Sequence, residues 1–190
     1  MEILAGRPGH LAPRVMEDVG RYRHKVFVET LGWELVTEEG KERDQFDGEE
    51  TIYLAARDES ENIIGTGRLL PTTGPYLLGD VFPELMGGAE VPRDPRVWEL
   101  SRFAAVDFTS PLAGALGQFS SEVTIALFHS ALNVAEENGA ERIITVSPLG
   151  VERLLRRKGI KAHRAAPPKI VGGHPIFACW IDIAGSDRQR

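Results

Sequence analysis

Two β-rich runs near the middle of the chain constrain the fold more than any other feature of the sequence. Residues 51–57 and 63–70 are rich in apolar and β-branched side chains, and the polar segment DESEN at 58–62 separates them. A short polar connection between two such runs is typical of a β-hairpin. The sequence therefore predicts two neighbouring antiparallel strands.

The segments on either side of this hairpin alternate between strand and helix patterns. Before it, residues 2–6 are predicted as a strand, and apolar side chains at helical spacing predict a helix from Pro13 to Gly32. Residues 33–50 lack this periodicity and are predicted as a loop. After the hairpin we expect helices at 82–86, 118–137 and 151–158, and strands at 97–106, 141–147 and 175–183. This order predicts an α/β fold in which helices cover both faces of a mixed sheet.

Length and composition suit one globular domain. The chain has 190 residues, of which 42% are hydrophobic and 26% charged, and we expect a single domain over residues 1–190. No apolar run approaches the ~18 residues that cross a membrane, and the N-terminus lacks a basic segment followed by an apolar one. We therefore expect a cytoplasmic protein without membrane contact. The single cysteine, Cys179, lies in an apolar run and is predicted to be a small core residue.

Basic side chains are concentrated near the C-terminus. Residues 1–140 contain 12 lysines and arginines against 24 acidic residues, whereas residues 141–190 contain 10 against 4. Five of them, called the basic patch below, are Arg153, Arg156, Arg157, Lys158 and Lys161. Such a patch favours an anionic partner. The overall pI of about 5.4 and the lack of interleaved aromatic residues argue against nucleic acid, so a small acidic protein or a phosphate-bearing ligand fits better.

A loop with three carboxylates, together with the helix before it, forms the first candidate site. The charged and aromatic residues of this region are Arg23, Phe27, Trp33, Glu42, Asp44, Phe46 and Asp47. Three carboxylates so close in sequence repel one another unless cations hold them. Aromatic ring faces and carboxylates both attract cations, so the combination favours a site for a positively charged organic ligand. A solvated acidic loop is the alternative.

The predicted strand at 97–106 carries a second candidate site. Glu99 and Arg102 lie three residues apart in an apolar context, where an unpaired charge is costly. In a regular strand they point to opposite faces, so both reach one site only if the strand is splayed or bulged near Glu99–Arg102. A structural ion pair is the alternative. Arg68, on the preceding strand, is a third buried cation that could bridge to Asp44 or Asp47.

Other chemical motifs are missing from the sequence. The five histidines show no metal-ligand spacing, and no motif for a nucleophile or a nucleotide-binding loop is present. We therefore expect no metal and no resident cofactor. Direct transfer between two bound substrates, with a carboxylate as the base, is the chemistry that remains.

Across nearly its whole length the chain resembles the LuxI-type acyl-homoserine-lactone synthase family. The resemblance rests on an E-x-D-x-x-D loop, on the segments RLLPTTGPYLL, VFPEL and WELSRF, and on three positions of the first helix and its end. The matching residues are Arg23, Phe27, Trp33, Glu42, Asp44, Asp47, Arg68, Phe82, Glu99 and Arg102.

The resemblance implies a three-layer α/β/α fold related to the GCN5-type (GCN5-related) N-acetyltransferases. It also implies synthesis of a signalling lactone from S-adenosylmethionine and an acyl group carried by acyl carrier protein or coenzyme A. The implied catalytic residues are Glu99, Arg102, Asp44 and Asp47. The implied substrate-binding residues are Arg23, Phe27, Trp33, Glu42, Arg68, Phe82, Phe103 and Ser147. The basic patch would dock the acidic acyl carrier protein.

Two other functions stay open at this point. One is a coenzyme A-dependent N-acetyltransferase of the same fold, although the segment PLAGALG before Gln118 is only a loose match to its pyrophosphate loop. The other is a non-catalytic module that binds an acidic partner through the basic patch. The sequence also leaves open the acyl length, the acceptance of 3-oxo or 3-hydroxy chains, the carrier, the oligomeric state, and whether Glu99 acts directly or through water.

Overall fold

The computed structural model describes residues 1–106, 108 and 122–183. The chain divides into two compact units. The first comprises Met1–Leu69 and Arg102–Ala131, and the second comprises Leu70–Ser101 and Leu132–Arg190. The predicted start of a helix at 118–121 and the tail at 184–190 lie outside the described residues.

Three antiparallel strands form the sheet of the first unit. They are β1 (Glu2–Gly6), β4 (Ile52–Arg57) and β5 (Ile63–Pro71), and β4 lies between the other two. The predicted hairpin is therefore present. Its register shifts by one residue between Ala56 and Arg57, which marks a β-bulge next to the turn.

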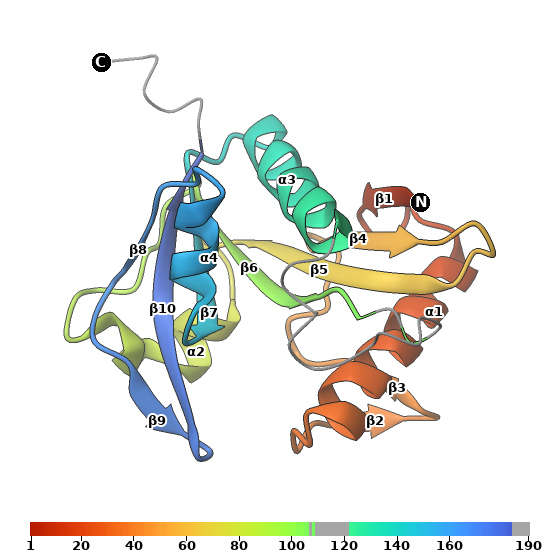
Figure 1. The fold of residues 1–190 in the computed structure, drawn as a ribbon, viewed down its shortest axis with the longest axis horizontal. Helices are drawn as coiled ribbons and strands as arrows, with labels where there is room; N and C mark the ends of the chain where they lie inside the picture. Colours follow the sequence, from red (N-terminus) through yellow and green to blue (C-terminus); the bar gives the residue numbers. More distant parts are fainter. Residues whose placement is uncertain (107, 109–121, 184–190) are drawn as a thin grey trace. The chain divides into compact units, whose positions relative to one another are not determined.

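Helices cover both faces of this small sheet (Figure 1). Helix α1 (Pro13–Arg23) begins at a proline, which is favourable in the first helical turn. The beginning of α3 (Glu122–Glu137) lies on the other face. If Gly65 carried a Cβ, this atom would lie only 3.2 Å from the Leu127 side chain of α3. A side chain at position 65 would crowd this helix, so the glycine permits its close approach.

The predicted helix from Pro13 to Gly32 changes type midway. Residues His24–Thr30 form a π-helix, η1, and Gly32 follows with φ of +69°. The extent of the helical region agrees with the prediction, but the hydrogen-bond pattern widens. Hydrophobic spacing cannot distinguish these two helix types, and short π-helical segments are frequent at functional sites.

A short hairpin occupies part of the segment that was predicted as a loop. Strands β2 (Thr37–Glu38) and β3 (Lys41–Glu42) pair across Glu39 and Gly40, whose φ angles are +50° and +72°. Two central residues with positive φ are typical of a type I′ hairpin turn. The hairpin brings Glu42 to its buried position.

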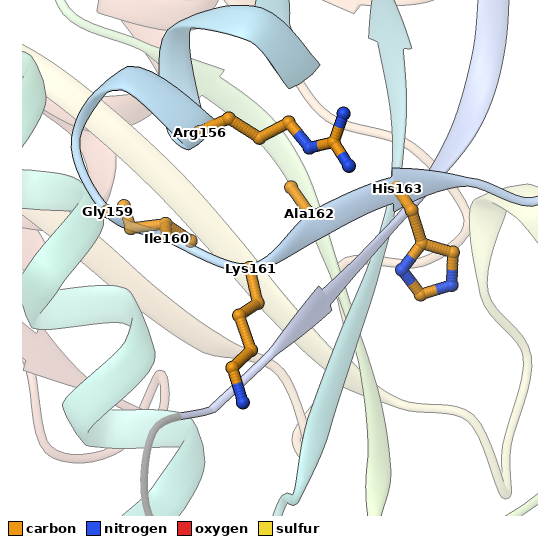
Figure 2. A pocket seen from close by; sticks show the side chains of 6 residues that line it. All are labelled: Arg156, Gly159, Ile160, Lys161, Ala162 and His163. Carbon is orange, nitrogen blue, oxygen red and sulfur yellow. The ribbon is translucent and has the colours of Figure 1, made fainter.

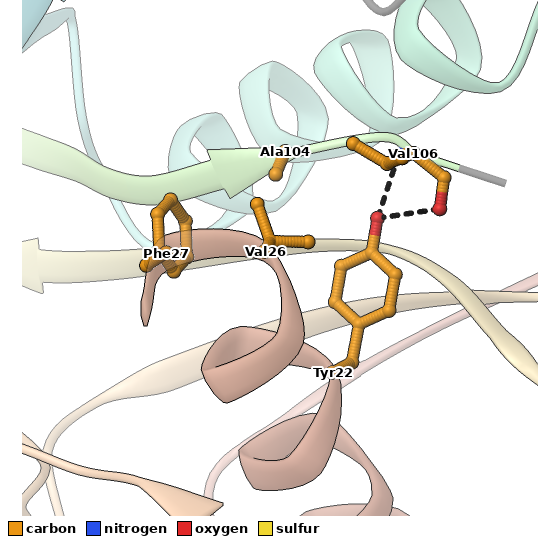
Figure 3. Close-up of a cluster of buried hydrophobic side chains, with 5 residues drawn as sticks. All are labelled: Tyr22, Val26, Phe27, Ala104 and Val106. Atoms are coloured by element: carbon orange, nitrogen blue, oxygen red, sulfur yellow. Dashed lines mark hydrogen bonds between the residues drawn. The ribbon is translucent and has the colours of Figure 1, made fainter. Parts of the chain in front are cut away.

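Apolar side chains join η1 to the end of strand β6 (Val97–Ala104) within the first unit. Figure 3 shows this cluster, which consists of Tyr22, Val26, Phe27, Ala104 and Val106. The Tyr22 hydroxyl donates to the carbonyls of Ile64 (3.1 Å) and Val106 (3.0 Å) and accepts from the Val106 N–H (2.6 Å). One buried hydroxyl thus contacts polar backbone groups of β5 and of the residues just after β6.

The second unit contains a mixed set of strands. Its strands are the beginning of β6, β7 (Arg142–Pro148), β8 (Ala162–Arg164), β9 (Lys169–Val171) and β10 (His174–Asp182). Strands β6 and β7 are parallel, whereas β10 pairs antiparallel with β7, β8 and β9. The short strands β8 and β9 were not predicted, because three residues are too few to show a period.

The second unit also contains three short helices. They are α2 (Leu77–Val81), the 3₁₀-helix η2 (Pro83–Met86) and α4 (Val151–Arg157). Helix α4 ends close to the predicted position before Gly159, whereas the predicted helix at 82–86 is the 3₁₀-helix, and α2 before it was missed. Cys179 on β10 is fully buried, and burial raises the pKa of its thiol to about 12, consistent with a small core residue. Within the described residues, no helix has both the length and the apolar character needed to cross a membrane.

Candidate active site

Six charged side chains meet in the first unit and alternate in sign. This charge ring consists of Arg23, Glu42, Arg102, Asp44, Arg68 and Asp47. Each arginine pairs with two carboxylates, and each carboxylate pairs with two arginines. The ring therefore holds three positive and three negative charges, and none of the six depends on a single partner.

Arg23 at the end of α1 begins the ring. Its Nε donates to Glu42 Oε2 at 2.6 Å, while Nη1 and Nη2 donate to the two oxygens of Asp47 at 2.8 and 3.0 Å. The bond to Asp47 is thus bidentate, which is the strongest geometry for an arginine and a carboxylate. Burial alone would lower the pKa of Arg23, but the hydrogen bonds and charges of Asp47 and Glu42 raise it.

Arg68 and Arg102 complete the ring. Arg68, on β5, binds both oxygens of Asp44 (2.5 and 3.1 Å) and reaches Asp47 at 3.1 Å. Arg102, on β6, donates to Glu42 at 3.0 Å and to Asp44 at 2.8 Å. The predicted bridge from Arg68 to Asp44 or Asp47 is therefore present in both forms. The three acidic residues are not a solvated loop, because their side chains are between 0% and 13% exposed.

The loop backbone helps to hold the carboxylates. Asp47 Oδ2 accepts the backbone N–H of Asp44 at 2.8 Å, and Asp44 Oδ1 accepts that of Phe46 at 2.9 Å. Burial would raise the pKa of Asp47, but its bonds to Arg23, the charge of Arg68 and the Asp44 N–H lower it well below its ordinary value. Asp47 is therefore ionised at neutral pH.

An aromatic pair borders the charge ring. Phe27 from η1 stacks on Trp33 with 5.0 Å between ring centroids and an angle of 24° between the ring planes. The guanidinium of Arg102 lies 5.5 Å from the centroid of Phe27 and 6.0 Å from that of Trp33. Phe27 is buried, but Trp33 is 41% exposed. The sequence predicted that these rings and the carboxylates converge, whereas the position of Arg102 beside both rings was not predicted.

Strand β6 departs from regular geometry where the sequence analysis predicted a splay or bulge. Its parallel pairing with β7 covers Val97–Glu99. Three residues after Glu99, Arg102 has φ of +50°, a region that non-glycine residues seldom adopt. Such backbone strain is often found at functional sites. Phe103, the next residue, is half-buried and packs edge-on against Phe128 at 5.9 Å.

Glu99 belongs to the second unit and holds the start of α2. Its side chain is fully buried, and its two carboxylate oxygens accept the backbone N–H groups of Leu77 (3.0 Å) and Leu78 (2.6 Å). Phe82, half-buried, ends the same helix, and its N–H donates to Leu78. Ser147 lies on β7 opposite Phe177 of β10 and is buried.

The basic patch lies on α4 and in the segment leading to β8, where its side chains are exposed. Two open pockets border it. The first, of about 340 Å³, is lined by Arg156 and by residues 159–163 (Figure 2). The second, of about 440 Å³, is lined by Arg153, Arg156, Arg157, Arg164 and Glu152. Glu152 pairs with Arg164 at 2.7 Å and with Arg156 at 3.7 Å.

One polar contact to the charge ring had no counterpart in the sequence analysis. The hydroxyl of Tyr53 on β4 donates to Asp47 Oδ1 at 2.8 Å. Tyr53 lies directly opposite Arg68 in the β4–β5 pairing. Opposed residues of an antiparallel pair share a face, so the hairpin pattern could have indicated Tyr53 if its register had been known. Among the described residues, no group of three or more His, Cys, Asp or Glu side chains could hold a metal ion.

Comparison with known proteins identifies the family. Residues 11–190 match the autoinducer synthase family. The acyl-homoserine-lactone synthase of Acinetobacter nosocomialis is 51% identical over 183 residues, which span 96% of this chain and 100% of the relative.

Solved structures give the same result. TofI, in a ternary complex with an inhibitor and MTA, is 41% identical with a TM-score of 0.82, covering 96% of this chain and 92% of TofI. BjaI, a CoA-dependent acyl-homoserine lactone synthase solved with SAM and isopentyl-CoA, is 29% identical with a TM-score of 0.81 and coverages of 95% and 82%. A putative N-acetyltransferase from Lactobacillus plantarum, 16% identical with a TM-score of 0.61 and coverages of 96% and 97%, shares the fold alone.

These matches confirm the predicted α/β fold, a mixed sheet related to that of the GCN5-type acetyltransferases. The same matches establish the enzyme class, because the curated relatives that span nearly the whole chain are acyl-homoserine-lactone synthases. The chain belongs to the autoinducer synthase family and is an acyl-homoserine-lactone synthase.

Proposed function

We propose that residues 1–190 act as one synthase domain, which transfers an acyl group from acyl carrier protein to the amine of S-adenosylmethionine and then closes the lactone. The observation that carries the proposal is the closed ring of three arginines and three carboxylates beside the Phe27–Trp33 pair. The presence of SAM in BjaI and of MTA in TofI supports the same substrate and the same released product here.

The charge ring is suited to the amino-acid end of the substrate. Its arginines can donate to a carboxylate, and its carboxylates can accept from an ammonium group. Because the six charges are already paired and buried, they hold their positions before the substrate arrives. The ring is neutral as a whole, so we expect recognition to depend on directed hydrogen bonds more than on net charge.

The Phe27–Trp33 pair is suited to the sulfonium and the adenine ring. Aromatic faces attract cations and stack on planar bases. Arg102 already lies near both rings, so the substrate would meet an organised surface. We assign Phe82 and Phe103 to substrate binding, and Ser147 to the part of the acyl site that responds to 3-oxo substitution.

In the first step, the neutral amine attacks the thioester carbonyl. The N–C bond forms, the C–S bond breaks, the carrier leaves as a thiol and the amine loses a proton. Glu99 is the proposed base, directly or through one water molecule, because two backbone N–H groups hold its carboxylate in a fixed orientation. A backbone N–H of β6 would polarise the thioester oxygen.

In the second step, the substrate carboxylate attacks its own γ-carbon. A C–O bond forms, the C–S⁺ bond breaks, and the sulfonium leaves as neutral methylthioadenosine. No external base is needed, and most of the advantage comes from holding the two atoms close together.

We assign the acyl donor to acyl carrier protein because the exposed basic patch suits an acidic protein surface. Acyl-CoA is the second candidate, because BjaI is a CoA-dependent synthase. We propose that the reaction takes place in the cytoplasm.

A product assay tests this function. The purified chain is incubated with S-adenosylmethionine and a series of acyl carrier protein or CoA thioesters, and mass spectrometry follows the lactone and methylthioadenosine. We expect equal amounts of both products, higher kcat/KM with the carrier protein, and loss of the reaction in folded Glu99→Gln. Acetylation of small amines without lactone would support an N-acetyltransferase, and tight partner binding without methylthioadenosine would support a binding module.

A further inference from the structure

The hydroxyl of Tyr53 is a neutral side-chain hydrogen-bond donor to the charge ring. It lies 2.8 Å from Asp47 Oδ1, the same oxygen that accepts Arg23 Nη1 at 2.8 Å and Arg68 Nη1 at 3.1 Å. Three donors from α1, β4 and β5 thus converge on one atom. A carboxylate oxygen held from three elements has little freedom to rotate or shift.

The position of Tyr53 in the sheet explains why its hydroxyl points toward Asp47. Tyr53 and Arg68 are opposed residues of β4 and β5, so their side chains leave the same face of the sheet toward Asp47. The Tyr53 side chain is only 3% exposed. Burial, followed by the negative charge of Asp47, raises the pKa of the phenol well above its ordinary value, so the hydroxyl keeps its proton.

We propose that Tyr53 is a positioning residue for S-adenosylmethionine, which acts by holding Asp47 between Arg23 and Arg68. This inference rests on the function proposed above, because it assigns the substrate to the charge ring. Without the phenol, Asp47 keeps its charge and both arginines, but loses the donor that fixes its oxygen from the side of β4.

The substitution Tyr53→Phe tests the role, since it removes one oxygen atom and no charge. We expect the KM for S-adenosylmethionine, and its dissociation constant measured by calorimetry, to rise about tenfold, the loss of about 1.4 kcal/mol. We expect kcat to change less than about threefold, because the proposed base and the thioester site are formed by other residues.

Tyr22→Phe is the matched control. Tyr22 is also buried in the first unit, at 5% exposure, but its hydroxyl bonds to the backbone of Ile64 and to that of Val106. Figure 3 shows the bonds to Val106. Its loss should lower the melting temperature at least as much as Tyr53→Phe does, and leave the KM for S-adenosylmethionine within about twofold. A purely structural role of Tyr53 predicts that the two variants behave alike.

A double-mutant cycle shows whether Tyr53 acts through Asp47. In the Asp47→Asn background, Tyr53→Phe should weaken S-adenosylmethionine binding by less than about a further twofold, because Tyr53 acts on the substrate through the Asp47 carboxylate. An unchanged KM in Tyr53→Phe, an equal rise in Tyr22→Phe, or a full effect in the Asp47→Asn background would overturn the inference. Failure of the unsubstituted chain to bind S-adenosylmethionine would instead refute the proposed function itself, and the assignment of Tyr53 with it.

Discussion

Asp47 joins two arginines, a backbone N–H and a phenol within the charge ring. Its buried position would be costly for a carboxylate alone. Because the donors lower its pKa below the usual value of about 3.9, the folded state binds a proton on Asp47 less readily than the unfolded state does. Asp47 therefore contributes stability above about pH 4, and that contribution is lost as the pH falls toward the lowered pKa.

Asp47→Asn should consequently lower the free energy of unfolding at pH 7 by about 3 kcal/mol, because Arg23 and Arg68 each lose one negative partner. It should also flatten the decline of stability below pH 4. Urea unfolding measured at several pH values between 2.5 and 7 checks both effects. Glu50→Gln, which removes an 80% exposed carboxylate, is the control and should leave the pH profile unchanged. A variant whose stability declines as steeply as that of the unsubstituted chain would contradict this account.

Arg102 shows what cannot be predicted at the scale of a single residue. The sequence identified it as a buried cation and indicated an irregular strand, and both features are present. Its partners could not be chosen from sequence, because Glu42 and Asp44 are about sixty positions away and reach it only through the folded loop. The φ of +50° is a local cost that the surrounding ion pairs and aromatic contacts offset.

At the scale of elements, the β2–β3 hairpin positions Glu42, yet its turn contains a residue type that is unfavourable for the turn conformation. Glu39 adopts φ of +50° at the first central position, where asparagine, aspartate and glycine are preferred. Glu39→Asn should therefore raise the free energy of unfolding by about 0.5–1 kcal/mol, because asparagine tolerates the left-handed region better. Thermal unfolding checks the gain.

Glu38→Asn is the matched control for this change, since Glu38 lies in the extended strand next to the turn and is likewise exposed. Asparagine is less favourable than most residues in a strand, so this variant should show no gain in melting temperature. A fall in stability for Glu39→Asn, or an equal gain for both variants, would show that the turn conformation is not the cause.

The sequence predicted the strands of the hairpin and the extent of the first helical region, but not the register of the strands or the change of helix type. The β4–β5 hairpin was predicted, but the one-residue shift between Ala56 and Arg57 sets which residue faces Arg68. If the register of the Arg57–Ile63 pair continued along the hairpin without this shift, Gly67 would lie opposite Tyr53 in place of Arg68. A slip of one residue moves a side chain to the other face, so the bulge determines that Tyr53 reaches Asp47.

At the scale of the whole molecule, the uneven distribution of charge could be predicted from the sequence, because counting the charged residues along the chain is enough. The chain carries a formal charge of −6, while its basic patch lies on exposed residues of α4 and the following segment. The charge ring could be predicted only in part. Its members were identified by residue type and resemblance, but its alternating closure depends on side-chain geometry that no spacing encodes.

The basic patch leads to a prediction about the acyl donor. The double variant Arg153→Glu/Arg157→Glu should reduce kcat/KM for acyl carrier protein about 10- to 100-fold at low ionic strength, because charge complementarity accelerates encounter. The loss should shrink as salt rises. The KM for S-adenosylmethionine should stay the same, since both side chains are exposed and neither belongs to the charge ring or to the Phe27–Trp33 pair. Arg7→Glu/Arg14→Glu, which makes the same charge change on the first unit, should have little effect.

Initial rates with acyl carrier protein and with acyl-CoA over a range of salt concentrations distinguish the possible roles of the patch. A carrier-protein surface predicts a large loss with the protein donor and a small one with acyl-CoA, whose few phosphates offer fewer contacts. Equal losses for both donors would mean that the patch attracts phosphate groups, and an unchanged rate with the carrier protein would mean that the donor docks elsewhere. In either case the uneven charge of the chain would need an explanation other than selection of an acidic protein.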